Sequence, residues 1–385
     1  MQYELTEEQK MLKAAVRKLA EEQIAPGVHE RDEKEEFSWE MVRLLRDGGY
    51  LGIDFPAEYG GGDAGMPAET IVIEELSRVD ASVGLLVADQ ALGALPIMLA
   101  GNKEVKDRFL PKLSTGEHLA AFALTETSGG SDVADFNCRA DKKGNGYILN
   151  GNKIFITNGS VADVVTVYVV TDPEKGASKG ASVLAVAKGT PGFSVGKHEM
   201  KMGIRSSDTV ELVFDDCHVP VENLVGEEGR GFAISMKTLD FARPAIAAQA
   251  LGIAQGALDY CINYAKERIV FGMPIIQHEG VGFKLADMCI FTEAARQLLY
   301  KTCSILQECP KNMTRLAPEQ IRYSSMCKTF ASDVAMKVTT EAVQIVGGFG
   351  YCRDYPLEQR MRDAKITQIY EGTNEIQRLV ISRAL

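Results

Sequence analysis

The sequence contains few of the residues that build metal centres and disulfide frameworks. Its 385 residues include only five histidines, eight cysteines and one tryptophan. No two cysteines form a Cys-x-x-Cys pair, and the histidines are isolated from one another without the spacing of metal ligands. We therefore expect no metal site, and reduced thiols in a reducing compartment.

Long apolar runs and targeting segments are missing as well. No run approaches the ~18–20 apolar residues that a membrane span requires. The start of the chain, MQYELTEE, has no basic region followed by an apolar one. A formal net charge of −11 disfavours nucleic acid or an anionic membrane surface as the main partner. The expectation is a cytoplasmic protein.

The composition is that of an ordinary soluble globular protein, with 45% hydrophobic and 25% charged residues. The length suggests roughly two or three domains, or one large composite. The sequence has no internal repeat, low-complexity tract or long linker. We therefore expect its parts to pack as one unit.

The amino-terminal third has the pattern of helices. Residues 6–25 open with a capping box of Thr6 and Gln9 and carry apolar residues along one helical face. Pro26 is expected to end this helix. Further helical patterns cover residues 39–47, 69–79, 83–99 and 103–112.

The pattern changes to short β-branched runs between residues 120 and 225. Residues 164–170, 182–186 and 210–214 read as strands, and Asn150-Gly151 between two such runs predicts a hairpin. After the glycine-rich turn at 226–231, helical patterns return. They cover residues 232–262, 281–308, 318–346 and 374–385.

These patterns predict an α+β multidomain fold with three parts. The predicted domains are an N-terminal helical domain at 1–118, a middle β domain at 119–226 and a C-terminal helical bundle at 227–385.

Glu371 stands where a structural protein would not choose an acid. Residues 361–370 read as a helix, Gly372 is a natural helix terminator, and Asn374 with Gln377 restarts a helix as a capping pair. At a helix C-terminus the backbone dipole disfavours a carboxylate by roughly 0.3–1 kcal/mol, and burial acts in the same direction. Both raise the pKa towards that of a general base. The alternative is a surface Glu in a helix–turn–helix connection.

The stretch from Arg362 to Thr373, RDAKITQIYEGT, resembles the C-terminal signature of the acyl-CoA dehydrogenase flavoproteins. The order of helical, β and helical parts also resembles that family, whose middle domain is β-barrel-like, so the resemblance covers essentially the whole chain. It implies an FAD cofactor and dehydrogenation of an acyl-CoA thioester to a 2-enoyl-CoA. It also implies Glu371 as the catalytic base for the α-proton and an electron-transfer flavoprotein as electron acceptor.

Two further segments resemble flavin-contacting segments of the family. One is a strand that runs into a Gly- and hydroxyl-rich turn, FALTETSGGSD; the other is the segment FITN. The first departs from the family pattern at Thr127 and Ser128, where Pro and Gly are usual. Taken alone, the first is a common turn between strands and the second a core strand with a buried Phe. The resemblance implies cofactor contacts from Phe122, Leu124, Thr125, Gly130, Ser131, Phe155, Ile156 and Thr157.

Other matching segments imply an assembly. The segment ERIVFGMPI resembles the one by which a subunit reaches the flavin of its neighbour, although Glu279 stands where Gln is frequent. Taken alone, this segment and QIVGGFGY are ordinary helix-ending turns. The resemblance implies a homotetramer built as a dimer of dimers, with further cofactor contacts from Arg268, Phe271, His278, Gln344, Gly347, Gly348, Thr373 and Glu375.

The resemblance also implies the thioester site. Asp240 and Arg243 match the region that meets the substrate, with Ser131, Tyr370 and Gly372. Without the resemblance, Asp240 and Arg243 read as solvated residues of a capped helix. Some relatives carry their catalytic Glu just before this Arg, but here that position is Ala242, so Glu371 takes the role.

Asp89 is the residue that bears most on the acyl group. It matches the helix that floors the family's acyl pocket, where an acid is unusual against an unbranched fatty chain. One interpretation is a solvated or hydrogen-bonded Asp. The other is a polar contact or second acid/base for a short, cyclic (cyclohexane-carboxyl-type) or functionalised acyl group. Val83 occupies the position of the Arg by which glutaryl-CoA dehydrogenases hold their terminal carboxylate, which argues against a dicarboxylate.

Two other classes of protein are possible. The same fold serves flavin monooxygenases and oxidases, which generally lack the Glu of this turn, so Glu371 counts against them. A nucleic-acid-binding relative would need a basic surface, which the acidic balance disfavours.

Overall fold

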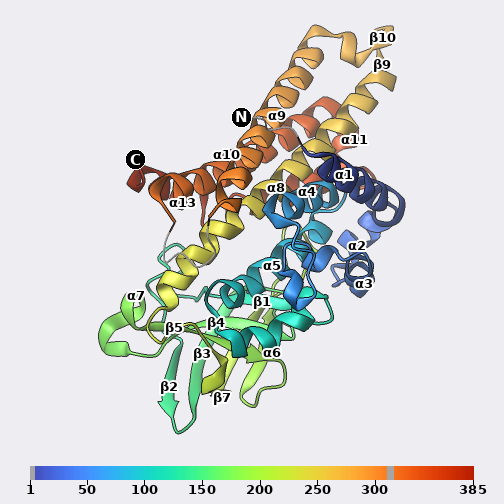
Figure 1. Ribbon diagram of the computed structural model, residues 1–385. Helices are drawn as coiled ribbons and strands as arrows, with labels where there is room; N and C mark the ends of the chain where they lie inside the picture. Colours follow the sequence, from blue (N-terminus) through green and yellow to red (C-terminus); the bar gives the residue numbers. More distant parts are fainter. Residues whose placement is uncertain (1–4, 310–315) are drawn as a thin grey trace.

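The computed structural model describes residues 5–309 and 316–385. Helices fill the chain as far as Ser114, strands dominate from Ala120 to Val225, and helices return from Gly231 onwards. Figure 1 shows the sheet at one end of the molecule and the long helices extending away from it. The predicted α+β architecture with a middle β domain is confirmed.

The N-terminal part begins with a capped helix. The Thr6 hydroxyl accepts from the Gln9 amide at 3.2 Å, and the Thr6 amide donates to Gln9 Oε1 at 3.0 Å, which confirms the predicted capping box. The helix is shorter than predicted, because a π-helical turn (Ala20–Ile24) and a 3-10 turn (Ala25–Gly27) replace its last residues. The helices are α1 (Glu7–Leu19), α2 (Val28–Lys34), α3 (Trp39–Asp47), α4 (Gly65–Ser77), α5 (Ala81–Ala100) and α6 (Lys103–Ser114).

The middle part is one eight-stranded sheet with the order β6-β7-β3-β2-β4-β5-β8, and β1 pairs with β4 in parallel. Val164–Val170, predicted as a strand, is fully buried. The strands are β1 (Ala120–Ala123), β2 (Arg139–Lys143), β3 (Gly146–Thr157), β4 (Val164–Val170), β5 (Ala181–Ala187), β6 (Phe193–His198), β7 (Thr209–Pro220) and β8 (Leu224–Val225).

The hairpin predicted at Asn150-Gly151 is wrong. Both residues lie inside β3, which pairs with β2 on one side and β7 on the other. Gly151, with a φ of 135°, sits at a shift of register against β7, and a Cβ there would lie 2.8 Å from the Cα of Cys138. The glycine therefore permits a bulge and a close approach instead of a turn. The turn between β2 and β3 lies at Gly144, whose φ is 60°.

The C-terminal part is built on α8 (Gly231–Glu267), a 37-residue helix. It runs from the sheet to a small hairpin of β9 (Ile269–Val270) and β10 (Met273–Pro274) at the far end of the molecule (Figure 1). The other α-helices of this part are α9 (Glu279–Gln307), α10 (Pro318–Val346), α11 (Gly348–Tyr351), α12 (Pro356–Ile366) and α13 (Asn374–Arg383).

The two helical parts share a core. Leu76 of α4 and Val87 of α5 belong to the same buried cluster as Leu251 of α8, Leu299 of α9 and Val338 of α10. This confirms that the helical parts pack as one unit around common interfaces.

The expectation that no run is long and apolar enough to span a membrane is wrong. By length and composition, α5 and α8 both pass that test. In each of them 78% of the apolar window is buried inside the protein. Their apolar surface is thus covered by the rest of the chain, as in the core helices of a globular protein.

Candidate active site

Side chains from all three parts of the chain line one cavity of about 190 Å³. Helices α5 and α8 supply two of its walls, strands β1 and β3 a third, and the segment between α12 and α13 a fourth. The cavity brings together these residues singled out from the sequence: Asp89, Phe122, Leu124, Thr125, Gly130, Ser131, Phe155, Ile156, Thr157, Arg243, Tyr370, Glu371 and Gly372.

Glu371 lies in a tight turn between two helices. The helix predicted for 361–370 ends at Ile366, and the next helix is capped by Thr373 instead of Asn374, with the Thr373 hydroxyl accepting from the Ile376 amide at 3.4 Å. Glu371 and Gly372 both have left-handed backbone, with φ of 52° and 93°. For Glu371 this conformation costs roughly 1–2 kcal/mol, so the turn holds it against its preference.

The Glu371 carboxyl is buried and has a raised pKa. Its Oε2 atom is buried and has no hydrogen-bond partner within residues 5–309 and 316–385. Burial raises its pKa from 4.5 to about 7, while the positive charges of Lys328 and Arg243 lower it. The predicted direction is confirmed, and of the two predicted causes burial is the one that acts, because α12 ends before the turn.

Asp89 faces the same cavity from α5. It is 5% exposed, and its Oδ2 has no hydrogen-bond partner in the described part of the chain. Burial, followed by the nearby charges of Glu371 and Asp208, raises its pKa well above the ordinary value. The interpretation of Asp89 as a solvated residue is therefore wrong. Two carboxyl groups that disfavour each other's ionisation line one cavity.

Tyr370, the residue before Glu371, is linked to α5 through a buried amide. The Tyr370 hydroxyl donates to Gln249 Oε1, and Gln249 Nε2 donates to the carbonyl of Ala81 at 2.9 Å. Ala81 is the first residue of α5. The turn with Glu371 and the helix with Asp89 are thus joined through α8.

The sheet side of the cavity suits a planar heteroaromatic group. Phe155 is 61% exposed and has a φ of 57°, so the interpretation as a buried core Phe is wrong. The hydroxyls of Thr125 and Thr157 make no hydrogen bond to any described residue. A strained, exposed aromatic ring beside two unused hydroxyls fits a flat ligand with polar edges.

Hydrogen bonds made by its own residues and by Lys153 hold the turn after β1. Glu126 accepts from the amides of Asn137 and Cys138, at 2.7 and 2.9 Å, and from the buried Lys153 ammonium at 2.7 Å. Ser128, a departure from the family pattern, donates to the carbonyl of Asp135 at 2.9 Å. The loop with Gly130 and Ser131 is therefore supported by its own hydrogen bonds.

Arg243 and Asp240 form a buried pair. Arg243 Nη1 lies 2.5 Å from Asp240 Oδ1 and 3.2 Å from the Ser325 hydroxyl. The side chains are buried, so the interpretation as a solvated pair is wrong. Arg243 lines the cavity, whereas Asp240 is not part of its lining.

Several predicted cofactor residues lie away from this cavity. Arg268 lies over the Phe349 ring at 5.9 Å, Phe271 is 90% exposed, and His278 Nε2 is 3.0 Å from the carbonyl of Val270. Gln344, Gly347 and Gly348, at the end of α10 and the start of α11, are exposed. Thr373 and Glu375 line a separate shallow hollow with Arg378. A single subunit does not bring these residues to the cavity.

Sequence reasoning missed several residues that support the site. Gln249 and Lys328 are buried polar residues within long helices, and Lys153 is a buried lysine in a strand. The available signal was a lone polar residue in an apolar run, as in Ala248-Gln249-Ala250. The partners of such a residue are set by tertiary packing, which the sequence does not show.

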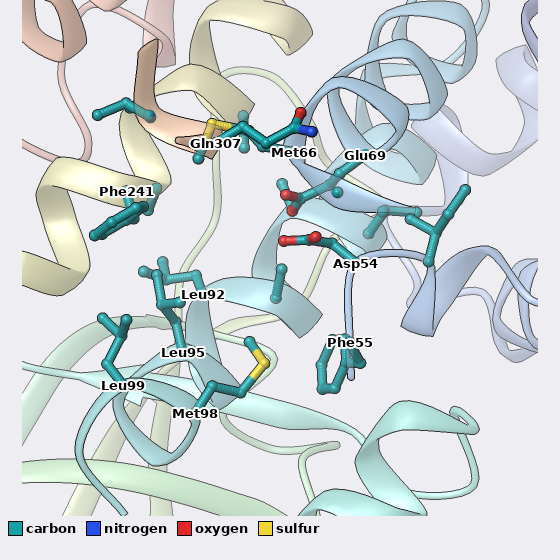
Figure 2. A pocket seen from close by; sticks show the side chains of 18 of the residues that line it. Asp54, Phe55, Met66, Glu69, Leu92, Leu95, Met98, Leu99, Phe241 and Gln307 are labelled. Atoms are coloured by element: carbon teal, nitrogen blue, oxygen red, sulfur yellow. The ribbon is translucent and has the colours of Figure 1, made fainter. Parts of the chain in front are cut away.

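A second cavity, of about 260 Å³, adjoins the first. Ala88 and Leu92 line both. Figure 2 shows its two kinds of wall, one of apolar side chains around Leu92 and Leu95, and one with the carboxyl groups of Asp54 and Glu69. Within the described residues no group of three His, Cys, Asp or Glu side chains is placed to hold a metal ion.

Comparison with known proteins identifies the family. The three acyl-CoA dehydrogenase family models match this chain: the N-terminal domain at residues 6–117, the middle domain at 121–217 and the C-terminal domain at 229–385. The chain is 46% identical to an acyl-CoA dehydrogenase of Bacillus subtilis, covering 99% of this chain and 98% of that protein. It is 48% identical to cyclohex-1-ene-1-carbonyl-CoA dehydrogenase of Geobacter metallireducens, with the same coverage.

Solved structures of similar proteins support the same family. The structure of butyryl-CoA dehydrogenase from Megasphaera elsdenii matches with a TM-score of 0.95 and 44% identity, covering 100% of this chain and 99% of that one. A chain from a study of the electron transferring flavoprotein of Acidaminococcus fermentans matches with a TM-score of 0.95 and 46% identity, with the same coverage. This chain belongs to the acyl-CoA dehydrogenase family.

Proposed function

We propose that this acyl-CoA dehydrogenase removes the α-proton of an acyl-CoA thioester with Glu371 and yields a 2-enoyl-CoA. The observation that carries the proposal is the buried, unpartnered Glu371 carboxyl, whose pKa of about 7 suits a base at neutral pH. Family membership and the short-chain and cyclic acyl-CoA relatives support the reaction class.

We propose FAD as the cofactor, held by the aromatic face of Phe155 and the hydroxyls of Thr125 and Thr157. When bound, FAD supplies the acceptor for the hydride that leaves the β-carbon. The strained exposed ring and the two unpartnered hydroxyls support this assignment. Phe122, Leu124, Gly130, Ser131 and Ile156 complete the proposed cradle on the same side of the cavity.

The proton step depends on the turn. A thioester α-proton is a weak acid, so the developing enolate needs stabilisation as well as a base. The backbone N–H of Glu371 has no acceptor among the residues that the structure describes. We assign it as the donor to the thioester carbonyl, so that Glu371 would supply both this donor and, with its side chain, the group that takes the proton. Arg243 and Tyr370, with Ser131 and Gly372, would hold the thioester part in place.

We propose a short-chain or cyclohexane-carboxyl-type acyl group as the substrate. The cavity lined by Glu371 is small, about 190 Å³, which supports a compact acyl group. Asp89 would contact that group through its unpartnered Oδ2. Val83, buried at the position of the glutaryl-CoA dehydrogenase Arg, offers no charge for a dicarboxylate.

The substrate test is an anaerobic titration of the holoenzyme with butyryl-CoA, a branched short acyl-CoA and cyclohexanecarboxyl-CoA. The measurements are the loss of flavin absorbance and the mass of the product. Dehydrogenation of one of them supports the function, and faster reaction with the cyclic thioester supports the role of Asp89. Equal or faster reaction with butyryl-CoA would remove the cyclic assignment, and rapid oxygen consumption after reduction would favour an oxidase or monooxygenase.

We propose a homotetramer built as a dimer of dimers, with an electron-transfer flavoprotein as electron acceptor. Exposed apolar side chains gather around the β9–β10 hairpin and α9, including Ile269, Phe271, Phe283 and Ile290. A neighbouring subunit would cover them and receive the contacts of Arg268, Phe271 and His278. All eight cysteines are free, which supports a reducing compartment such as the cytoplasm.

A further inference from the structure

Lys328 lies directly behind the turn that carries Glu371. It belongs to α10, and its side chain is fully buried. Its Nζ donates to the carbonyl of Gly372 at 2.8 Å and to Asn374 Oδ1 at 3.0 Å. Both acceptors follow Glu371 within three residues, whereas Lys328 is not part of the cavity lining. The ammonium group therefore contacts the turn and not the space for substrate.

Neutral groups already hold the backbone of this turn. Gln377 Nε2 donates to the carbonyls of Glu371 and Gly372, at 3.0 Å each. Asn374 Nδ2 donates to the Ser332 hydroxyl at 2.9 Å and to Asp333 Oδ1 at 2.8 Å. Burying an ammonium group is costly. A purely structural role would not require a charge at this position.

The charge acts on the base. Lys328 is the first of the two groups that lower the pKa of Glu371, and Arg243 on α8 is the second. Burial lowers the pKa of Lys328 itself to about 7, Glu371 raises it, and Arg243 lowers it. Asp333 and Glu375 raise it further, and Asp89 on α5 is the other acid beside Glu371. The buried amine and the buried carboxyl thus favour each other's ionised form.

We propose that Lys328 is a positioning residue for proton abstraction, which fixes the Glu371–Gly372 peptide and keeps the Glu371 carboxyl ionised. This inference rests on Glu371 being the base. Without the ammonium, burial would raise the pKa of Glu371 further, so a larger share of the enzyme would hold its base protonated at neutral pH. The loss of rate would then be greatest at low pH and smallest at high pH.

The test compares the pH dependence of flavin bleaching by a substrate thioester in single turnover for four holoenzymes. K328M removes the charge and the donor, K328Q removes the charge and keeps an N–H donor on a shorter side chain, and K328R keeps the charge. K337M, at an exposed lysine of the same helix, is the control. For K328M and K328Q we expect the pH midpoint of the bleaching rate to rise by about one pH unit or more. At about pH 6 this is a roughly tenfold or greater loss of rate. The difference in bleaching rate between these variants and the wild type should disappear above pH 9. The pH midpoints of K328R and K337M should stay near that of the wild type.

Flavin content and melting temperature are measured alongside, because a merely structural lysine would lower both without moving the midpoint. If the flavin of K328Q bleaches with the same pH midpoint as that of the wild type, the inference is overturned, whatever the result for K328M. Failure of the proposed function looks different, since then no thioester would bleach the wild type at any pH.

Discussion

At the residue scale, the account depends on two carboxyl groups that share one cavity. Glu371 and Asp89 each have a buried oxygen without a partner in the described chain. Such atoms are costly in a structure that only needs to fold. A bound substrate would supply the missing contacts. Without it, the buried carboxyl groups lower the stability of the folded protein.

The E371Q variant is expected to be more stable than the wild type at high pH. The pKa of the folded-state carboxyl is raised from 4.5 to about 7. The folded state therefore binds this proton more tightly than the unfolded state, and stability falls as pH rises between these values. At about 1.4 kcal/mol per unit, the cost above pH 7 is roughly 3 kcal/mol.

Thermal melting of the holoenzyme at pH 8 and pH 4.5 measures this effect. E371Q should melt at a higher temperature at pH 8, and the difference should vanish near pH 4.5. A difference that stays constant over this range would show that Glu371 is not buried as described.

At the scale of elements, the turn between α12 and α13 is the feature that places Glu371, the proposed base, in the cavity. Gly372 has a φ of 93°, and an added Cβ would lie 2.6 Å from Gln377 Nε2. That amide is the group that holds the carbonyls of Glu371 and Gly372. Position 372 therefore combines backbone strain with a contact on which the turn depends.

The G372A variant is expected to lose about 1–2 kcal/mol of stability and tenfold or more in the rate of flavin bleaching. The matched control is G144A, since Gly144 has a φ of 60° and open space around its Cα in the distant β2–β3 turn. G144A should lose similar stability and keep the rate. Equal rates for the two variants would argue against a fixed turn.

The elements that depend on local pattern could be predicted from the sequence. Trp39–Asp47, Val164–Val170 and Pro318–Val346 have their predicted bounds, because apolar periodicity and caps define them. Asn150-Gly151 has the same local signal as a hairpin, but pairing on both sides of β3 makes it a bulge. Glu371 could be singled out because it is an acid directly before Gly372 at a helix end. The buried contacts of Gln249 and Lys328 could not be predicted, because they depend on packing between helices far apart in the chain.

At the scale of the whole molecule, the proposed cofactor site is divided between the cavity and residues that a single chain leaves outside it. Phe271 is 90% exposed and has a φ of 50°. An exposed, strained aromatic residue has no purpose in an isolated subunit. Phe271 lies between β9 and β10, and this hairpin stands far from the sheet, which suits a contact with a neighbour (Figure 1).

The F271D variant is expected to dissociate into smaller species and to lose flavin on gel filtration, while each subunit stays folded. Light scattering and the ratio of flavin to protein absorbance measure both effects. The control is M11D, since Met11 is 71% exposed and belongs to α1 instead of the hairpin. An F271D protein with wild-type mass and full flavin would contradict the proposed assembly.

The most direct test of the central claim is anaerobic mixing of E371Q holoenzyme with the best thioester substrate. The account predicts wild-type flavin content and tight binding of the thioester. It also predicts a fall in the rate of bleaching by roughly a thousandfold or more, because the base is gone. Bleaching at the wild-type rate would show that another group takes the proton and would contradict the account.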